Sequence, residues 1–266
     1  MISCCTIPQE EEPIDYKEAY EAAIRSKLAY KEPIEILSMI KHNLDLYEQY
    51  ISPQPKFITS PQESDQDAQA YIWKKDNTIY LSFRGTSSKK DIIADADIRT
   101  HKIKDKIYVH RGFYLQFRSI ESLITQEIHD ATEYLYISGH SLGGGLAQIA
   151  AAFYAELFPN CKVICHTFGA PRTGNKHFVE WFNKNVHKNY RFVNSQDPVP
   201  MIPQRPIWTH TCEKCIQIDD KNTIKIITKD TKWYSRLFKT LITIDFFNPI
   251  HDHDCDIYLD RIKKMI

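Results

Sequence analysis

The stretch from residue 135 to residue 158, "LYISGHSLGGGLAQIAAAFYAELF", decides how this chain folds. Its first residues, with Tyr134 before them, are aromatic or aliphatic, as is typical of a short buried strand. From residue 146 onward, apolar residues recur at the spacing of one helix face, which predicts a helix. Only a few residues separate the two elements, and Gly139 and Gly143 let the neighbouring backbones approach closely. The stretch therefore predicts a sharp strand-to-helix turn with a serine at its tip.

Ser141 stands in the middle of the G-x-S-x-G pattern "GHSLG". Between a strand and a helix, this pattern is typical of a nucleophile elbow, whose strained turn exposes the serine hydroxyl above the sheet at the positive end of the helix dipole. A glycine-rich turn with an ordinary serine N-cap would have the same letters. Ser141 is therefore the candidate nucleophile, and the pattern needs support from the rest of the chain.

The composition is that of a globular protein whose charges cancel. Of the 266 residues, 34 are Lys or Arg, 34 are Asp or Glu, and 42% are hydrophobic. The length fits one α/β domain, which we expect over residues 15–266 after a loose N-terminal tail over residues 1–14. The balanced charge argues against nucleic acid as the main partner.

The sequence shows no signal for secretion or membrane insertion. The first residues, "MISCCTIPQEEEP", lack the basic and apolar regions of a secretory signal. No apolar run approaches the length of a membrane span. We therefore expect an intracellular, cytoplasmic protein or one that contacts a membrane peripherally.

Strands and helices alternate along the predicted domain. From periodicity and turn residues we expect two helices over 15–50, a loop over 51–67, a strand hairpin over 68–85, a polar surface flap over 87–106, a helix over 113–129, the strand and helix around Ser141, a strand over 161–168, a helix near 176–184, a strand over 189–194, a second hairpin over 207–229, and helices near 231–244 and 252–264. This alternation predicts an α/β fold with a mainly parallel central sheet and helices on both faces.

A serine hydroxyl needs a base, an acid that orients the base, and donors for the developing oxyanion. In open α/β sheets, catalytic groups gather beyond the carboxyl ends of the strands. Asp197 lies three residues beyond the strand predicted at 189–194 and is the candidate acid, although a loop aspartate forming an Asx-turn would look the same. Near the C-terminus, "PIHDHDCDIYL" supplies His251 and His253 as candidate bases. The order serine, acid, histidine is the one that the α/β-hydrolase fold follows.

Two backbone N–H groups are candidate oxyanion donors. The first belongs to Leu142, the residue after the candidate nucleophile. The second belongs to Thr86, which follows the predicted strand "YLSF" and the turn residue Gly85 and also offers a hydroxyl group. Both residues are expected at strand ends on the same edge of the sheet.

The C-terminal histidines also allow a metal site. The run "HDHDC" at 251–255 contains His, Asp and Cys, and Cys212 and Cys215 form half of a zinc motif. The second half of that motif is missing, and the aspartates fit equally well as helix N-cap and first-turn residues. A zinc protein is therefore a lower-ranked rival hypothesis, and we expect neither a metal nor another cofactor.

Seven pieces of the sequence, in order, resemble the lipase class 3 family, a group of fungal lipases and plant and bacterial acylhydrolases. The pieces are "LSFRGTSS", "VHRGFY", "ISGHSLGGGLAQIAA", "TFGAPRTGNKHF", "RFVNSQDPVPMIP", "WTH" and "HDCDIYL". The resemblance covers roughly residues 15–262. It implies the α/β-hydrolase fold and a serine acyl-ester hydrolase, a lipase or carboxylesterase, that cleaves acylglycerol or phospholipid esters through an acyl-enzyme without a cofactor.

The resemblance also implies a role for each residue of the candidate triad. Ser141 would be the nucleophile, Asp197 the orienting acid and His253 the base. His253 is preferred to His251 because the family's histidine usually lies five residues before a tyrosine, which is Tyr258 in this chain.

The resemblance assigns the oxyanion donors to Thr86 and Leu142 and a lid to the segment after Thr86. The lid of secreted relatives often carries a tryptophan, where this chain has Ile92 and Ile93 among charged side chains. This departure argues against strong interfacial activation on neutral fat.

Two alternatives concern lipid binding. Residues 221–239 combine six basic side chains with an apolar helix face. They could lie on an anionic membrane, or the apolar face could pack against the sheet.

The same fold could also serve a catalytically inactive lipid-binding or adaptor protein. Because every catalytic residue type is present, we expect an active ester hydrolase. This expectation includes phospholipase A1-like activity. We expect His110 and His140 to have structural roles.

Overall fold

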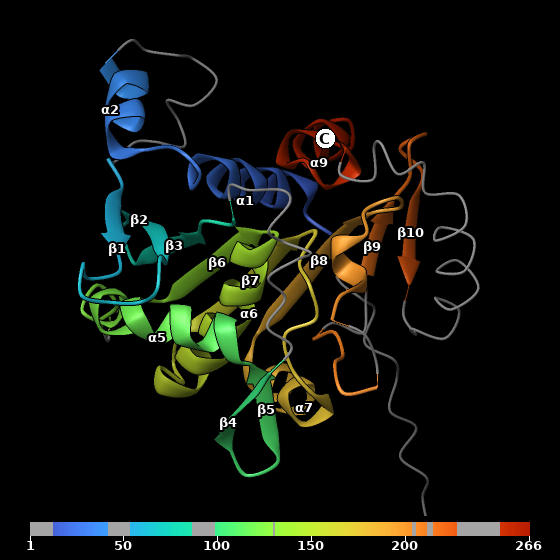
Figure 1. Cartoon of the computed structure of the whole chain (residues 1–266). Helices are drawn as coiled ribbons and strands as arrows, with labels where there is room; N and C mark the ends of the chain where they lie inside the picture. Colours follow the sequence, from blue (N-terminus) through green and yellow to red (C-terminus); the bar gives the residue numbers. More distant parts are fainter. Residues whose placement is uncertain are drawn as a thin grey trace, which may run out of the picture.

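An eight-stranded sheet forms the centre of the molecule, in the order β1-β2-β3-β6-β7-β8-β9-β10 (Figure 1). In the computed structural model these strands are β1 (Lys56–Thr59), β2 (Gln69–Lys75), β3 (Thr78–Phe83), β6 (Tyr134–His140), β7 (Lys162–Phe168), β8 (Lys188–Asn194), β9 (Cys215–Ile218) and β10 (Ile224–Ile227). Strands β3, β6, β7, β8 and β9 run parallel, and antiparallel pairs extend the sheet at both ends. The predicted mainly parallel sheet is confirmed.

The structure describes most of the chain. The described residues are 13–41, 54–86, 99–129, 131–203, 206–211, 215–227 and 251–266. Within them, β4 (Thr100–Lys104) and β5 (Ile107–His110) pair as a separate two-stranded sheet. No helix among these residues combines the length and the apolar character needed to cross a membrane.

Helices cover both faces of the sheet (Figure 1). One face carries α5 (Arg111–Thr125), α6 (Leu142–Leu157) and α7 (Lys176–Asn185), and the other carries α1 (Tyr16–Leu28) and α9 (Cys255–Lys263), while α2 (Pro33–Lys41) follows α1. Each face has its own apolar core, with Phe117 and Phe178 in the first and Ile24 and Ile262 in the second. Helices on both faces were predicted and are confirmed.

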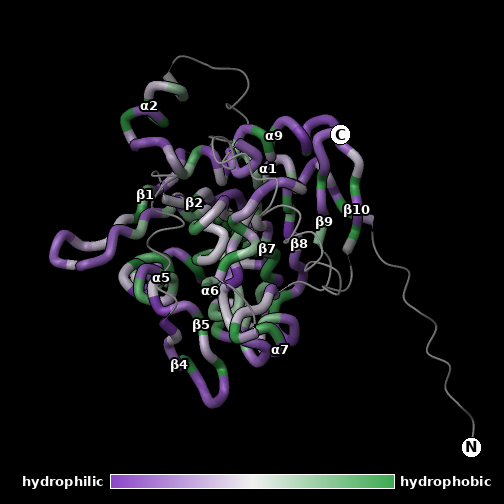
Figure 2. The backbone as a smooth tube through the Cα atoms, turned by 45° about the vertical axis from the view of Figure 1, so that its right-hand side comes forward, coloured by the Kyte–Doolittle hydropathy of each residue, from purple (hydrophilic) through white to green (hydrophobic). Residues whose placement is uncertain are grey.

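Inner strands of the sheet contact both apolar cores, as β2 shows. In β2, Ile72 belongs to the core under α5 and α6, whereas its neighbours Tyr71 and Trp73 belong to the core under α1 and α9. Because successive side chains of a strand point to opposite faces, a strand between two cores reads as a continuous apolar run. Hydrophobic stretches accordingly gather around β7 and α6, whereas the turn between β4 and β5 is hydrophilic (Figure 2).

Both predicted hairpins are present, as β2–β3 and β9–β10. Three short strands differ from expectation. Strand β1 lies in the predicted loop over 51–67, and β4 and β5 lie in and beside the predicted flap. Each has only four or five residues, and β4 contains no buried residue, so pairing with a neighbour rather than periodicity defines them. The rest of the flap, residues 87–98, and the helix predicted near 231–244 lie outside the described residues.

Candidate active site

Ser141 lies at the turn between β6 and α6, with backbone angles of φ 58° and ψ −130°. A positive φ is strained for any residue with a side chain. A Cβ added at Gly139 would lie 2.2 Å from the carbonyl oxygen of Gly143, and one added at Gly143 would lie 2.4 Å from that of Phe83. The turn therefore requires both glycines, and the Ser141 N–H holds it by donating to the Phe168 carbonyl at 3.0 Å.

The Ser141 hydroxyl is not used to cap α6, although the residue occupies the N-cap position. Its Oγ lies 2.8 Å from Nε2 of His253. The other nitrogen of that ring, Nδ1, lies 3.0 and 2.9 Å from the two carboxylate oxygens of Asp197. The structure thus brings the three predicted residues together, with 0% of Ser141, 0% of Asp197 and 2% of His253 exposed.

The hydrogen-bond partners determine where the protons lie. A carboxylate only accepts, so Nδ1–H of His253 donates to Asp197, and in the neutral ring Nε2 accepts from the Ser141 hydroxyl. Asp197 also accepts from the Tyr258 hydroxyl at 2.7 Å and from the Val199 N–H at 2.9 Å. Burial and the charge of Asp197 raise the pKa of Tyr258 well above its ordinary value, so the phenol stays protonated and donates.

The two C-terminal histidines have different surroundings, although both lie in the short 3-10 helix η2 (His251–His253). The side chain of His251 is 62% exposed and lies 3.7 Å from the Asp252 carboxylate, whereas His253 is buried against the serine. Asp252 also pairs with Arg261 through two contacts of 3.1 and 3.2 Å. Asp254 is the N-cap of α9. Asp254 therefore serves the start of the last helix, and Asp252 contacts a side chain of its last turn.

No group of three or more His, Cys, Asp or Glu side chains in the described part of the chain is placed to hold a metal ion. The thiols of Cys215 in β9 and Cys255 in α9 are buried. Cys212, the other cysteine of that half-motif with Cys215, lies outside the described residues.

The two candidate oxyanion donors lie on neighbouring segments. Leu142 is the first residue of α6, where a backbone N–H has no partner within its own helix. Thr86 follows β3, and the chain leading to it passes close to the serine turn. A Cβ at Gly85 would lie only 2.7 Å from the carbonyl oxygen of His140. The strand end that carries Thr86 therefore packs against the turn that carries Leu142.

His110 and His140 both make contacts that stabilise the fold. His110 caps α5 by accepting from the Phe113 N–H at 3.4 Å, and its ring stacks on that phenylalanine. The Nε2 of His140 lies 2.6 Å from the backbone carbonyl oxygen of His253. Sequence reasoning missed this contact and the bond from Tyr258 to the acid, because they join residues 113 and 61 positions apart in the chain.

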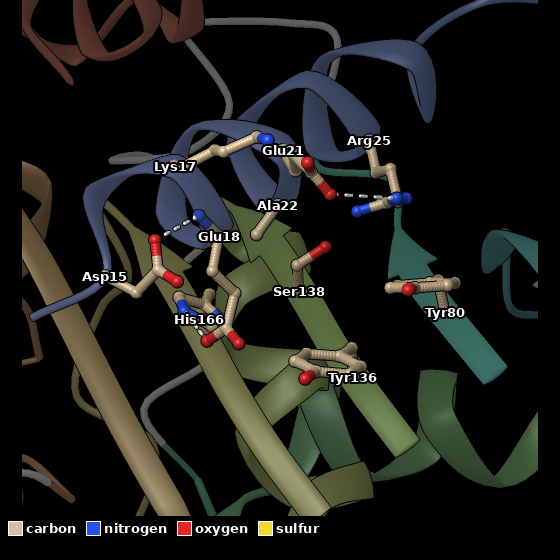
Figure 3. Close-up of a pocket in the computed structure, with 10 residues that line it drawn as sticks. All are labelled: Asp15, Lys17, Glu18, Glu21, Ala22, Arg25, Tyr80, Tyr136, Ser138 and His166. Atoms are coloured by element: carbon tan, nitrogen blue, oxygen red, sulfur yellow. Dashed lines mark hydrogen bonds and ion pairs between the residues drawn. The ribbon is translucent and has the colours of Figure 1, made fainter. Parts of the chain in front are cut away.

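A cavity of about 250 Å³ lies elsewhere, between α1 and the sheet (Figure 3). Its polar walls include Glu18, whose carboxylate lies 3.3 Å from Nε2 of His166, and Glu21, which pairs with Arg25 at 3.5 Å. The phenol rings of Tyr80 and Tyr136 complete the lining on the sheet side. None of the candidate catalytic residues lines this cavity, so it is separate from the candidate active site.

Comparison with known proteins identifies the relatives of this chain. Residues 80–206 match the family described as Lipase (class 3). Toxin TseL of Vibrio cholerae is 37% identical over 106 residues, which are 39% of this chain and 16% of the toxin. A lipase of Rhizopus niveus is 28% identical over 163 residues, which are 57% of this chain and 42% of the lipase. The resemblance to the class 3 lipases is confirmed.

The class 3 lipase-like chain also resembles solved lipases in three dimensions. The triacylglyceride lipase of Rhizomucor miehei matches it with a TM-score of 0.70 and 19% identity, over 91% of this chain and 94% of that one. The fold is therefore the α/β-hydrolase fold. The chain spans less than half the length of the curated relatives it matches.

Proposed function

We propose that this class 3 lipase-like protein is a serine hydrolase that cleaves carboxylic esters of lipids through an acyl-enzyme. One observation carries the proposal. The ring of His253 lies 2.8 Å from Ser141 Oγ and 2.9 Å from the carboxylate of Asp197, and all three side chains are buried. A serine hydroxyl is a weak nucleophile until such a base is hydrogen-bonded to it and oriented from behind.

In the proposed reaction, Nε2 of His253 takes the proton from Ser141 as Oγ attacks the ester carbonyl carbon. Asp197 keeps the ring in the required tautomer and stabilises the imidazolium. The backbone N–H groups of Leu142 and Thr86 donate to the oxyanion of the tetrahedral intermediate, and the Thr86 hydroxyl is a further donor. The proton then passes from His253 to the leaving alcohol. Water repeats these steps on the acyl-enzyme and releases the carboxylic acid.

The proposed substrates are acylglycerols and phospholipids. The likeness to proteins named as lipases supports a lipid ester rather than a small soluble ester. Phospholipase A1-like activity and peripheral membrane contact are finer parts of the same proposal. Most of the amphipathic segment that suggested membrane contact, residues 228–239, lies outside the described residues.

A fluorophosphonate probe and p-nitrophenyl butyrate hydrolysis test the proposed nucleophile. Ser141→Ala should abolish labelling and lower kcat by ~10⁶-fold while the protein stays folded. Ser138→Ala is the matched control, because Ser138 is buried in β6, three residues before Ser141, and bonds to Ser82 Oγ at 3.1 Å. The control should keep both labelling and hydrolysis. Wild-type rates in Ser141→Ala would refute the assignment.

The substrate class is tested with p-nitrophenyl esters of increasing chain length, followed by defined diacylglycerols and phospholipids. Hydrolysis that rises with chain length and extends to the natural lipids is the expected result. A folded wild-type protein that binds lipid vesicles but neither reacts with the probe nor hydrolyses any ester would favour the inactive lipid-binding or adaptor protein.

A further inference from the structure

A chain of hydrogen bonds joins the end of helix α1 to the segment that carries His253. The hydroxyl of Tyr30, two residues beyond α1, lies 2.9 Å from Nδ1 of His140. The other nitrogen of that ring, Nε2, lies 2.6 Å from the backbone carbonyl oxygen of His253. Tyr30 thus reaches the candidate base through one intervening side chain.

The chemistry of the partners sets the direction of each bond. The carbonyl oxygen of His253 can only accept, so His140 donates to it from Nε2–H. In the neutral ring Nδ1 then carries a lone pair, and the Tyr30 hydroxyl donates to it. Burial raises the pKa of Tyr30 well above its ordinary value, which keeps this donor protonated.

Tyr30 also contacts the strand end that carries the candidate oxyanion donor. The backbone of Gly85, the residue before Thr86, lies close against the Tyr30 hydroxyl. A Cβ at Gly85 would lie only 2.1 Å from that oxygen, so no larger residue would let the phenol approach this closely. The Tyr30 hydroxyl therefore contacts the Gly85–Thr86 segment directly, and it is linked to the segment that carries His253 through the ring of His140.

We propose that Tyr30 is a positioning residue for ester hydrolysis, which holds the Gly85–Thr86 segment and the His253 segment at the separation that the transition state requires. This inference rests on the proposed function. Catalytic geometry tolerates little error, because a displacement of about 1 Å costs ~10²-fold in rate. Tyr30 contacts none of the three triad side chains directly. Removing its hydroxyl should therefore lower kcat less than such a displacement does, by roughly tenfold.

Tyr30→Phe tests the proposal, because it keeps the ring and removes only the hydroxyl. With p-nitrophenyl butyrate, kcat should fall roughly tenfold while KM stays within about twofold of the wild-type value. A merely structural role would lower Tm and leave kcat intact at temperatures well below Tm. Unchanged kcat in the folded variant would therefore overturn the proposal.

Tyr71→Phe is the matched control. The Tyr71 hydroxyl is also held at the end of α1, where it donates to the Lys31 carbonyl at 2.9 Å, one residue from Tyr30. This control removes a phenol hydrogen bond of the same kind without touching His140. It should lower Tm by a similar amount and leave kcat unchanged, and an equal loss of kcat in Tyr71→Phe would overturn the proposal.

A double-mutant cycle tests the route through His140. If Tyr30 acts through that ring, the Tyr30→Phe, His140→Ala double variant should be no slower than His140→Ala alone. Fully additive losses would overturn this route. Assays of the wild-type protein distinguish failure of the Tyr30 proposal from failure of the proposed function. If it hydrolyses ester and its nucleophile reacts with fluorophosphonate, normal kcat in Tyr30→Phe refutes only the role of Tyr30. A folded wild-type protein without either activity would refute the proposed function and this inference together.

Discussion

Gly169 is the residue whose replacement tests the geometry of the candidate site most directly. It follows β7 with φ +60°, a conformation that costs residues other than glycine free energy. A Cβ on this residue would lie 2.6 Å from Oδ2 of Asp197, 3.0 Å from the Tyr258 hydroxyl and 3.1 Å from Nδ1 of His253. The methyl group of Gly169→Ala should therefore displace the side chains whose hydrogen bonds orient the candidate base.

The size of the effect follows from the shortest of these distances. At 2.6 Å, the new methyl group would be about 0.8 Å short of the 3.4 Å at which ordinary van der Waals contact begins. The Gly169 N–H donates to the Phe192 carbonyl at 3.0 Å and anchors the backbone, so the carboxylate of Asp197 has to move. A displacement near 1 Å predicts a fall in kcat of ~10²-fold. The left-handed backbone adds ~1–2 kcal/mol of destabilisation, or roughly 2–8 °C in Tm.

Gly112→Ala is the matched control for this experiment. A Cβ on Gly112, the second residue of α5, would lie 3.4 Å from the nearest atom of His110, which is ordinary contact. Alanine also favours a helix over glycine by up to ~1 kcal/mol, so the control should keep its stability and its kcat. Both variants are compared by thermal unfolding and by p-nitrophenyl butyrate kinetics below either Tm. A kcat for Gly169→Ala within a factor of about three of wild type would refute the reasoning, because the methyl group would then fit without moving Asp197.

Three further predictions follow from the same geometry. His253→Ala should lower kcat about as far as loss of the nucleophile does, because triad members fail as a unit, whereas His251→Ala should keep most activity; ester kinetics that rank the two in reverse would move the base to His251. Thr86→Val should lower kcat by ~10²-fold with little change in KM, and an intact kcat would exclude its hydroxyl as a donor. The folded-state pKa of Tyr258 is raised by burial and by Asp197, so its contribution to stability is present below pH ~10 and is lost as pH rises above that value. Denaturant unfolding should therefore show a falling free energy of unfolding above pH ~10 and a smaller fall in Tyr258→Phe; equal slopes would contradict this.

The serine turn could be predicted because short-range constraints determine it. A buried strand, two glycines and a helix within about 24 residues allow few backbone paths, and the structure has the predicted turn at Ser141. The hairpin β2–β3 is predictable for the same reason, since Asp76 takes the positive φ that its turn needs. Strand β4 carries no such local signal, because none of its residues is buried and its pairing with β5 defines it.

The supporting contacts of the candidate site could not be predicted from local pattern. Tyr30 and His140 are 110 residues apart, and Tyr258 is 61 residues from Asp197. Only the folded sheet and the two helices on one of its faces bring them together. Tyr258 entered the sequence argument as a spacing marker for His253, and its hydroxyl supplies the physical reason for that spacing. One turn into α9, the phenol reaches the acid while the histidine before the helix reaches the serine.

The surroundings of Asp197 couple stability to chemistry. The residue is fully buried, and an ionised carboxylate in such a place is costly unless donors surround it. Its donors come from Val199, Tyr258 and His253, and the last of these is also the candidate base. Removing a donor therefore weakens the fold and misorients the base in one step, so a fall in activity alone does not reveal a catalytic role. It is Gly169 that separates the two effects. In Gly169→Ala, the φ of +60° accounts for a loss of stability of limited size. A loss of kcat measured well below Tm is accounted for only by the 2.6 Å approach of the new Cβ to Asp197.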